Sequence, residues 1–303
     1  MKSAIVAIAV LFCLVSRAEA DTCVLNRATS VEMSRSESGG VLVPMTINDQ
    51  AVAMLVDTGG VYSSLKDSAV DKLGLPRNWQ VFTGETMFGG KNLTRYVSAS
   101  RVNFGGLNAY KFNFVVMPDD VLPKEAQGTI APDVLGANDV DFDFANNKFS
   151  LFSQKHCYGG VVYWTRGYFA QIPFKVNEYD HHIEIDVTLD GKPTRAILDT
   201  GSTTSIMSYE YARDTLGVDP KSPDLKALDP KEEKFQGYRY PFKTLSFGDI
   251  VVTNPHIILV PRSSSKLGDV EPPIIIGMSI LSKLHLYIAY GEHNLYITGA
   301  DAH

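Results

Sequence analysis

Two stretches of the chain decide its fold: residues 46–60, with the sequence TINDQAVAMLVDTGG, and residues 188–202, with the sequence TLDGKPTRAILDTGS. Each begins with a threonine and contains an Asp-Thr-Gly triplet, and the spacing from this threonine to the aspartate is the same in both. The apolar residues before each triplet predict a buried strand. The chain therefore contains an internal repeat, whose aspartates are Asp57 and Asp199.

Turn and cap signals accompany both copies of the repeat. Asn48-Asp49 and Asp190-Gly191 predict tight turns between paired strands, as expected for a β-hairpin. A helix-like stretch follows each triplet and ends near a glycine, Gly74 in one copy and Gly217 in the other. Glycine directly after a helix favours a left-handed C-terminal cap.

The downstream parts of the two copies also correspond. Val134-Leu135-Gly136 follows the first triplet at nearly the spacing at which Ile275-Ile276-Gly277 follows the second, so we align these two motifs. Each copy then closes with an alternating, aromatic-rich strand pair, residues 142–152 and 286–297. We expect the second copy to carry a helical insert, Ser279 to Leu284, that the first largely lacks.

Short β-prone runs separated by glycine and proline fill most of the remaining chain. They predict an all-β protein of two similar lobes with few short helices. We place the N-terminal lobe at residues 21–153, a linker at 154–166 and the C-terminal lobe at 167–303.

Composition excludes several classes of protein. The 303 residues are 45% hydrophobic and 20% charged, values typical of a globular protein rather than a disordered, collagen-like or coiled-coil one. The formal net charge is −6, and no long basic run is present. Nucleic-acid binding, which needs a basic surface against the phosphates, is not expected.

The first 20 residues have the pattern of a signal peptide. Lys2 gives a basic start, residues 4–15 are apolar, and Ala18-Glu19-Ala20 has the small-x-small pattern of a cleavage site. The alternative is an uncleaved anchor, but the apolar stretch is shorter than the roughly 20 residues that cross a bilayer. We expect a mature chain that starts at Asp21, is exported to a periplasmic or extracellular space, and has no stable membrane insertion.

Cysteine usage agrees with export. Cys13 leaves with the signal peptide, and Cys23 and Cys157 remain, an even number that suits one disulfide in an oxidising compartment. The alternative is two buried or reactive thiols. Neither cysteine has the spacing of a metal site to another cysteine or histidine.

A repeated Asp-Thr-Gly is informative because of what two neighbouring carboxyl groups do. Such a pair does not ionise twice readily, so it shares one proton over a range of pH. One carboxylate then acts as a base on water while the other, protonated, acts as an acid on a carbonyl oxygen. Asp57 and Asp199 are therefore candidate partners for hydrolysis of a peptide bond without a metal or a covalent intermediate.

Apolar-apolar-Asp-Thr-Gly with a distal apolar-apolar-Gly resembles the aspartic proteases of the pepsin and retropepsin clan. The motif residues are Leu55 to Gly59 with Val134 to Gly136, and Ile197 to Gly201 with Ile275 to Gly277. The resemblance covers residues 40–298 and implies a bilobal acid-protease fold. Each lobe is close in size to a retropepsin-like unit, as if a retropepsin dimer were fused into one chain.

The resemblance also implies a site. Asp57 and Asp199 would be the catalytic dyad at the lobe interface. Supporting active-site loops would include Thr58, Gly59, Thr200, Gly201 and Ser202. Threonine offers a hydroxyl that bonds across to the other lobe, and glycine lets backbone N–H groups approach a carboxylate closely.

A glycine-rich hairpin over the cleft is the remaining feature that the resemblance implies. Residues 82–98 hold the tip Phe88-Gly89-Gly90 between β-prone arms, and we predict a substrate-binding flap there. Gln236-Gly237-Tyr238 would be the corresponding turn of the second lobe. An ordinary hairpin is the alternative at each place.

The chain departs from the family pattern after the first triplet. The family carries Ser, Thr or Ala at that position; here Ser202 follows the second triplet, but Gly60 follows the first. A hydroxyl there would donate to the adjacent carboxylate and lower its pKa. We therefore hypothesise that Asp57, which lacks it, is the more easily protonated of the two.

These patterns together predict an exported, monomeric aspartic endopeptidase that acts on polypeptides and needs no metal or organic cofactor. The alternative is a catalytically inert binder of peptides or inhibitors with the same fold.

His181-His182 beside Asp180 is a weaker candidate, for a metal site. Because neighbouring strand residues face opposite sides, we interpret it as a solvated strand start. No Gly-x-Ser-x-Gly motif surrounds the serines near the triplets.

Overall fold

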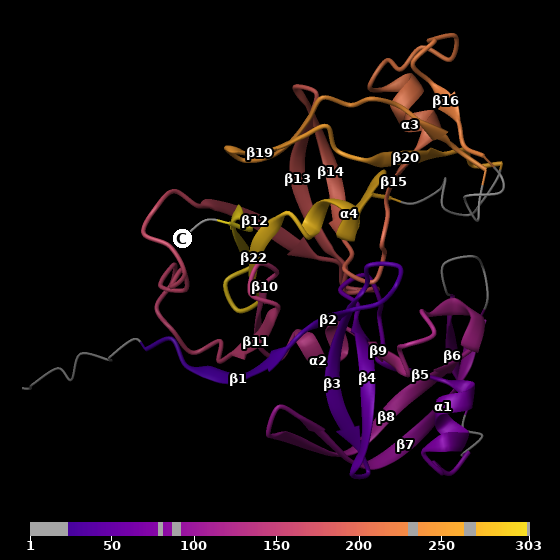
Figure 1. The fold of residues 1–303 in the computed structure, drawn as a ribbon, viewed down its shortest axis with the longest axis vertical. Coiled ribbons are helices and arrows are strands. Elements are labelled where there is room, and N and C mark those ends of the chain that lie inside the picture. Colours follow the sequence, from indigo (N-terminus) through magenta and orange to yellow (C-terminus); the bar gives the residue numbers. More distant parts are fainter. Residues whose placement is uncertain (1–23, 78–80, 87–91, 230–235, 264–270, 302–303) are drawn as a thin grey trace, which may run out of the picture.

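The structure of the protein, a computed structural model, describes residues 24–77, 81–86, 92–229, 236–263 and 271–301. Figure 1 shows that these residues are mostly β-strand, with a few short helices, in two lobes stacked along the long axis. The predicted all-β, two-lobed fold is confirmed. The predicted signal peptide, residues 1–20, lies outside the described residues.

The N-terminal lobe pairs its strands in the order β2-β3-β4-β9-β5-β8-β7-β6, with a further pairing of β3 and β7. The strands are β2 (Ser34–Arg35), β3 (Val41–Ile47), β4 (Gln50–Val56), β5 (Ser64–Lys66), β6 (Val81–Thr86), β7 (Asn92–Phe104), β8 (Leu107–Met117) and β9 (Gly128–Ile130). The helices are α1 (Asp67–Lys72), a 3-10 turn (Asp119–Val121) and α2 (Pro132–Leu135).

The C-terminal lobe repeats this plan. Its strands are β12 (Ala170–Val176), β13 (Ile183–Leu189), β14 (Lys192–Leu198), β15 (Ser205–Ser208), β16 (Lys226–Ala227), β17 (Tyr238–Arg239), β18 (Thr244–Phe247), β19 (Ile250–Thr253), β20 (Ile257–Val260) and β21 (Ile274–Ile276). Its helices are α3 (Tyr209–Asp214) and α4 (Met278–Leu281). The pairing around the triplet is the same in both lobes: β14 pairs parallel with β21, as β4 pairs parallel with β9 in the first lobe.

The sheet of the C-terminal lobe continues beyond β12 into strands of both halves, in the order β12-β23-β22-β10-β11-β1. The strands not yet named are β1 (Arg27–Glu32), β10 (Asp139–Asp143), β11 (Lys148–Phe152), β22 (Leu284–Ala289) and β23 (Asn294–Gly299). The antiparallel pair β10–β22 is the seam between the halves. The predicted closing strand pairs are confirmed as the hairpins β10–β11 and β22–β23, and their buried aromatic side chains form part of the core.

The local signals around the triplets are also confirmed. β3–β4 and β13–β14 are hairpins whose turn residues Asn48, Asp49, Asp190 and Gly191 all have positive φ, the backbone of a two-residue hairpin turn with mirror-image geometry. Gly74 and Gly217 follow α1 and α3 with φ of 63° and 72°, as a left-handed cap requires.

The alignment of Val134-Leu135-Gly136 with Ile275-Ile276-Gly277 is wrong. Val56, just before the first aspartate, pairs with Ile130, whereas Leu198, just before the second, pairs with Ile276. The first-lobe counterpart of Ile275-Ile276-Gly277 is therefore Thr129-Ile130-Ala131. The two motifs matched in spacing only because the path from the triplet to the returning strand is shorter in the first lobe.

The predicted helical insert in the second copy, Ser279 to Leu284, is wrong for the same reason. α4 follows β21 directly, and α2 follows β9 in the same way. Val134 and Leu135 lie in α2, so they correspond to residues of α4 and not to the strand before it. Both lobes therefore have the short helix.

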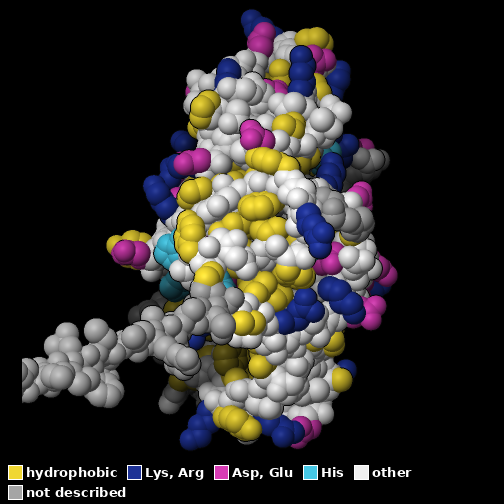
Figure 2. Space-filling model, turned by 90° about the vertical axis from the view of Figure 1, so that its left-hand side faces the viewer, with side chains coloured by type: hydrophobic (Ala, Val, Ile, Leu, Met, Phe, Trp, Pro, Cys, Tyr) yellow, Lys and Arg dark blue, Asp and Glu magenta, His cyan; other side chains and the backbone are white. Residues whose placement is uncertain are grey.

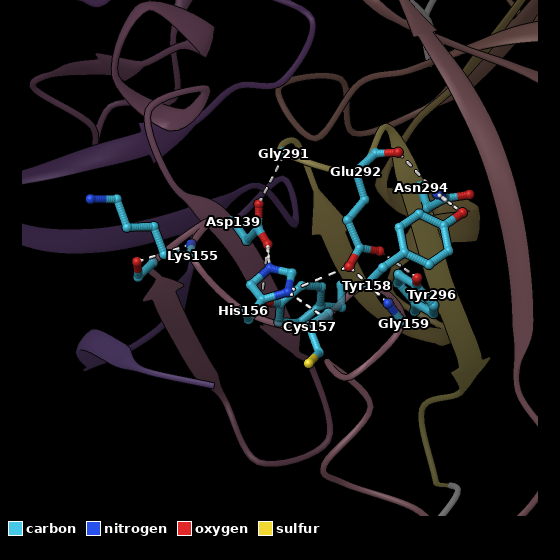
Figure 3. Close-up of polar contacts among 12 residues, drawn as sticks. Asp139, Lys155, His156, Cys157, Tyr158, Gly159, Gly291, Glu292, Asn294 and Tyr296 are labelled. Carbon is cyan, nitrogen blue, oxygen red and sulfur yellow. Dashed lines mark hydrogen bonds and ion pairs between the residues drawn. The ribbon is translucent and has the colours of Figure 1, made fainter. Parts of the chain in front are cut away.

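The connection from β11 to β12 is held by a buried polar cluster, seen in Figure 3, where His156 lies between Asp139 and Glu292. His156 Nε2 lies 2.5 Å from the Asp139 carboxylate, and both side chains are about 1% exposed or less. Burial raises the pKa of Asp139. Burial acts to lower the pKa of His156, but the bond to Asp139 and other partners raise it. Cys157 is next in the chain, but Cys23 lies outside the described residues, so their disulfide stays a prediction.

On the face shown in Figure 2, hydrophobic side chains gather across the middle, and charged side chains of both signs lie around them. Within the described part of the chain, no helix is long and apolar enough to cross a membrane.

Candidate active site

Each aspartate of the repeat stands at the end of a buried strand. The N–H of Asp57 donates to the carbonyl oxygen of Ile130 at 2.9 Å, and the N–H of Asp199 donates to that of Ile276 at 3.0 Å. The residues before both aspartates are apolar and buried, so burial of each strand fixes the position of the aspartate that follows it. The pairing of β4 with β9 and of β14 with β21 then fixes the side of the strand on which the aspartate side chain lies.

The two triplets meet through their threonines. Thr58 N–H donates to Thr200 Oγ1 at 3.1 Å, and Thr200 N–H donates to Thr58 Oγ1 at 3.0 Å. Each hydroxyl then donates across the interface, Thr58 to the carbonyl of Leu198 and Thr200 to that of Val56. Both threonines are fully buried. The predicted cross-lobe role of Thr58 and Thr200 is therefore present in the structure.

The glycines of the triplets lie against the opposite aspartates. A Cβ atom built on Gly59 would overlap the carboxyl group of Asp199, and one built on Gly201 would overlap that of Asp57. No side chain fits between the lobes at these two points. The absent side chains let each carboxyl group reach the lobe interface, which explains why the triplet needs glycine there.

The two carboxyl groups lie close together at the lobe interface: Gly59 lies against the carboxyl group of Asp199, Gly201 lies against that of Asp57, and both aspartates line one cavity. Asp57 also accepts from Gly59 N–H at 3.1 Å. Asp199 accepts from the N–H groups of Gly201 and Ser202 at 2.8 and 3.0 Å. Stronger donation to Asp199 favours its ionised form, because backbone N–H groups stabilise a carboxylate.

The pKa directions agree with this difference. Burial, and next the negative charge of Asp199, raise the pKa of Asp57 well above its usual value. Burial also raises the pKa of Asp199, but the N–H groups of Ser202 and Gly201 and the charge of His182 act against it. Both carboxyl groups therefore take up a proton more readily than an exposed aspartate does, and the two backbone N–H bonds favour the carboxylate form at Asp199.

The cause given in the hypothesis about Ser202 is wrong, and the order in which the two aspartates are protonated stays a prediction. The hydroxyl of Ser202 donates to the carbonyl oxygen of Thr204 at 2.7 Å and not to Asp199. Its backbone N–H, and not its hydroxyl, stabilises the Asp199 carboxylate. A Cβ on Gly60 would lie 3.0 Å from the Asp57 carboxyl oxygen, so the first lobe has little room for a side chain there.

A cavity of about 540 Å³ opens over the dyad and contains both aspartates. Its walls are largely apolar, and the apolar lining residues are Leu55, Val61, Leu93, Met117, Val121, Leu122, Ile197 and Ile275. Asp180 and His182 line the cavity as well. An apolar cavity with a few polar groups over a perturbed carboxyl pair is the usual form of an active site.

The interpretation of the His181-His182 pair as a solvated strand start is wrong for His182. His181 is exposed, but the side chain of His182 is half-buried, at 22% exposed, and its Nε2 lies 2.7 Å from the carbonyl oxygen of Gly59 in the other lobe. Within the described residues, no group of three or more His, Cys, Asp or Glu side chains is arranged to hold a metal ion.

The predicted flap is described only in part. β6 and β7 form an antiparallel hairpin, in which Thr86 pairs with Asn92. Leu93 of β7 lines the cavity. The tip residues Phe88, Gly89 and Gly90 lie outside the described residues, so their contact with a substrate stays a prediction.

The turn predicted at Gln236-Gly237-Tyr238 in the second lobe is wrong. Tyr238 lies in β17, and Ala227 of β16 pairs with it. Gln236 and Gly237 therefore stand on the returning arm of the hairpin. Glycine at this point suits a close approach, since a Cβ on Gly237 would lie 2.6 Å from the carbonyl oxygen of Leu259.

Residues that sequence analysis missed support the two loops. In the N-terminal lobe, Ser63 donates its N–H and its hydroxyl to Asp133. In the C-terminal lobe, Ser205 donates its N–H to the hydroxyl of Ser279, and the two hydroxyl groups share a second hydrogen bond. Ser63 is 1% exposed, which excludes it as an accessible nucleophile. These partners are far apart in the chain, and neither the residue types nor their spacing marked them.

Comparison with known proteins agrees with this geometry. A model of the aspartyl protease family matches residues 43–137 and 185–280, once for each lobe and over more than half of the chain. The chain belongs to the aspartyl protease family. The predicted resemblance is confirmed.

A solved structure shares the fold. The crystal structure of the aspartic proteinase from Irpex lacteus matches with a TM-score of 0.51 and 13% identity, over 90% of this chain and 97% of that one. At this identity the likeness concerns the fold alone. No curated protein sequence matches the chain.

Proposed function

We propose that the protein is an exported aspartic endopeptidase that hydrolyses peptide bonds with water activated between Asp57 and Asp199. The observation that carries the proposal is the pair of buried carboxyl groups, one from each lobe, that lie close together, with one backbone N–H bonded to Asp57 and two bonded to Asp199. Such a pair shares one proton and supplies an acid and a base together.

The chemistry follows from the protonation states. Asp199, as carboxylate, takes a proton from the water, whose oxygen bonds to the peptide carbon, while Asp57 gives its proton to the carbonyl oxygen. The tetrahedral intermediate then collapses: the C–N bond breaks and the amine nitrogen takes a proton from Asp199. The hydroxyl proton returns to Asp57. The dyad ends in its starting state with one water consumed.

The substrate is a polypeptide, which membership of the family supports. The apolar lining of the cavity favours hydrophobic side chains next to the cleaved bond. The β6–β7 hairpin contributes one wall through Leu93, so an extended segment would lie between this hairpin and the dyad.

The inert binding protein is the second candidate. Damage to the dyad or to its supports would favour this candidate. Here both aspartates, both threonines and both following glycines are present, and the threonine cross-bonds are intact. These contacts favour the active enzyme.

Cleavage of an unfolded peptide library from about pH 3 to 7.5 tests the proposal, because the shared proton confines activity to a pH range. The control is the double variant Asp57→Asn, Asp199→Asn, which removes contaminating activity from the comparison. Cleavage by the wild type alone supports the enzyme. Retention of peptides without cleavage by the wild type supports the inert alternative.

Export, the disulfide and the monomeric state belong to the same proposal. The signal-like residues 1–20 support export, and the pair Cys23 and Cys157 suits an oxidising compartment. One chain supplies both aspartates, so a second copy is not needed to complete the site. Mass spectrometry of the exported protein checks all three: an N-terminus at Asp21, a bridged peptide before reduction, and a native mass of one chain.

A further inference from the structure

His182 occupies a special position in the repeat. Glu184 of β13 pairs with Ile197 of β14, and continuing this register places His182 opposite Asp199. In the first lobe Leu42 pairs with Leu55, and the same continuation places Gly40 opposite Asp57. The two aspartates therefore have different neighbours: one faces an imidazole, and the other faces a residue without a side chain.

The imidazole of His182 touches two acceptors. Nε2 lies 2.7 Å from the carbonyl oxygen of Gly59, and Nδ1 lies 3.2 Å from a carboxylate oxygen of Asp180. Asp180 also accepts the backbone N–H of His182 at 3.1 Å, which holds it in place. A carbonyl oxygen only accepts, so Nε2 carries the hydrogen of its bond to Gly59, and the carboxylate of Asp180 at ion-pair distance from Nδ1 favours the charged imidazolium.

The contact joins the lobes at the dyad. Gly59 donates its N–H to Asp57 and accepts from His182 at its carbonyl, so His182 holds the loop that carries Asp57. The equivalent position in the first lobe is Gly40, which has no side chain to hold Gly201. The hydrogen bond from His182 to the Gly59 loop is therefore made on one side of the dyad, and Gly40 makes no equivalent side-chain bond on the other side.

The positive charge of an imidazolium at His182 acts on the dyad. The ionisable groups around His182 are Asp180 on its own loop, Asp199 at the end of β14 and Asp57 from the other lobe, with Glu184 further along β13. Glu184 is paired with Arg195. On Asp199, which the strand register places opposite His182, this positive charge acts against the effect of burial on the pKa.

We propose that His182 is a positioning residue that makes the dyad unequal: it keeps the negative charge on Asp199, leaves the proton on Asp57, and holds the Gly59 loop. This proposal rests on the proposed endopeptidase function. It gives the dyad a fixed direction, in which Asp199 is the base toward water and Asp57 the acid toward the carbonyl oxygen.

Two substitutions at this residue separate charge from contact. His182→Gln keeps a hydrogen-bond donor near Gly59 without a charge, and His182→Lys keeps a positive charge without the ring. The neighbouring, exposed His181 supplies the matched control, His181→Gln. Thermal unfolding of all variants establishes that each is folded.

The readout is the acidic limb of kcat/KM against pH. Loss of the positive charge raises the pKa of the dyad's base, so His182→Gln moves this limb to higher pH by roughly one unit. His182→Lys recovers at least half of the shift, and His181→Gln leaves the limb in place. An unmoved limb in His182→Gln, or a Lys variant that shifts as far as the Gln variant, overturns the proposal.

A titration without substrate tests the role of His182 even if the proposed endopeptidase function is wrong. The ¹³C NMR signals of labelled aspartate carboxyl groups report the dyad directly, with Asp57→Asn and Asp199→Asn for assignment. If the wild type cleaves no peptide, the proposed function fails, but the titration still decides the inference. A higher pKa of Asp199 in His182→Gln supports it, and an unchanged titration contradicts it.

Discussion

Thr58 and Thr200 form a reciprocal pair across the lobe interface, in which the N–H of each donates to the hydroxyl of the other, at 3.1 and 3.0 Å. Each hydroxyl donates onward to a strand carbonyl in the opposite lobe. The two aspartates therefore stand on a hydrogen-bonded network that belongs to both lobes. A change in either threonine affects both carboxyl groups.

Thr58→Ala tests this network. The substitution leaves Thr200 N–H and the Leu198 carbonyl without partners in a buried site, which costs about 2–4 kcal/mol in the free energy of unfolding. kcat falls as well, because the spacing of the carboxyl groups is no longer fixed. Urea unfolding and steady-state kinetics measure the two effects. Thr58→Ser keeps the hydroxyl and serves as control; equal losses in Ala and Ser variants would show that the hydroxyl is not responsible.

Gly201→Ala tests the close approach of the lobes. The new methyl group overlaps the Asp57 carboxyl group, and displacement of a catalytic group by about 1 Å lowers kcat roughly 100-fold. Gly299→Ala is the matched control, since a Cβ there meets nothing within 4 Å. A Gly201→Ala enzyme with wild-type kcat would contradict the predicted contact.

The dyad also predicts how stability depends on pH. Burial and the charge of Asp199 raise the pKa of Asp57 in the folded protein. Between the unfolded and the folded pKa the folded protein binds more protons, so the free energy of unfolding falls as pH rises through this window. Asp57→Asn resembles the protonated form, and it flattens the decline and leaves the protein about 1–2 kcal/mol more stable above the window than the wild type.

Urea unfolding from pH 3 to 8 measures this dependence. Asp119 is a control of opposite sign, because the N–H and hydroxyl of Ser68 lower the pKa of Asp119. Asp119→Asn removes stability at the higher pH values instead of adding it. Parallel curves for the wild type and Asp57→Asn would mean that Asp57 has no raised pKa.

The connection between the lobes gives a further prediction. His156→Ala leaves the buried carboxylate of Asp139 without its closest partner, and breaking a buried pair in this way costs about 3–5 kcal/mol. Thermal and urea unfolding measure the loss. His256 is exposed, so His256→Ala is a control with little expected effect, and a similar small effect in His156→Ala would show that the pair contributes little.

Much of the fold was predictable because its signals are local. The hairpin turns at Asn48-Asp49 and Asp190-Gly191, the glycine caps after α1 and α3, and the apolar strands before the triplets depend on neighbouring residues. Asp57 and Asp199 were predictable because a repeat marks both copies. Such signals need no knowledge of which strands meet.

The errors come from relationships that are not local. Matching Val134-Leu135-Gly136 to the second copy assumed equal path lengths to the returning strand, and only the pairing of Val56 with Ile130 shows otherwise. His182 beside Asp180 has the composition of a solvated turn. Its contact with Gly59 joins the two lobes, and a single-sequence pattern does not contain it.

The most direct test of the account compares kcat/KM of the wild type, Asp57→Asn and Asp199→Asn on one peptide chosen from the cleaved library. Both variants keep the size of the side chain and remove one carboxyl group, so unfolding curves confirm that each is folded. We expect a loss of at least about 1,000-fold in both variants, since acid and base are each required. A folded variant of either kind that retains activity within tenfold of the wild type would contradict a mechanism that uses both aspartates.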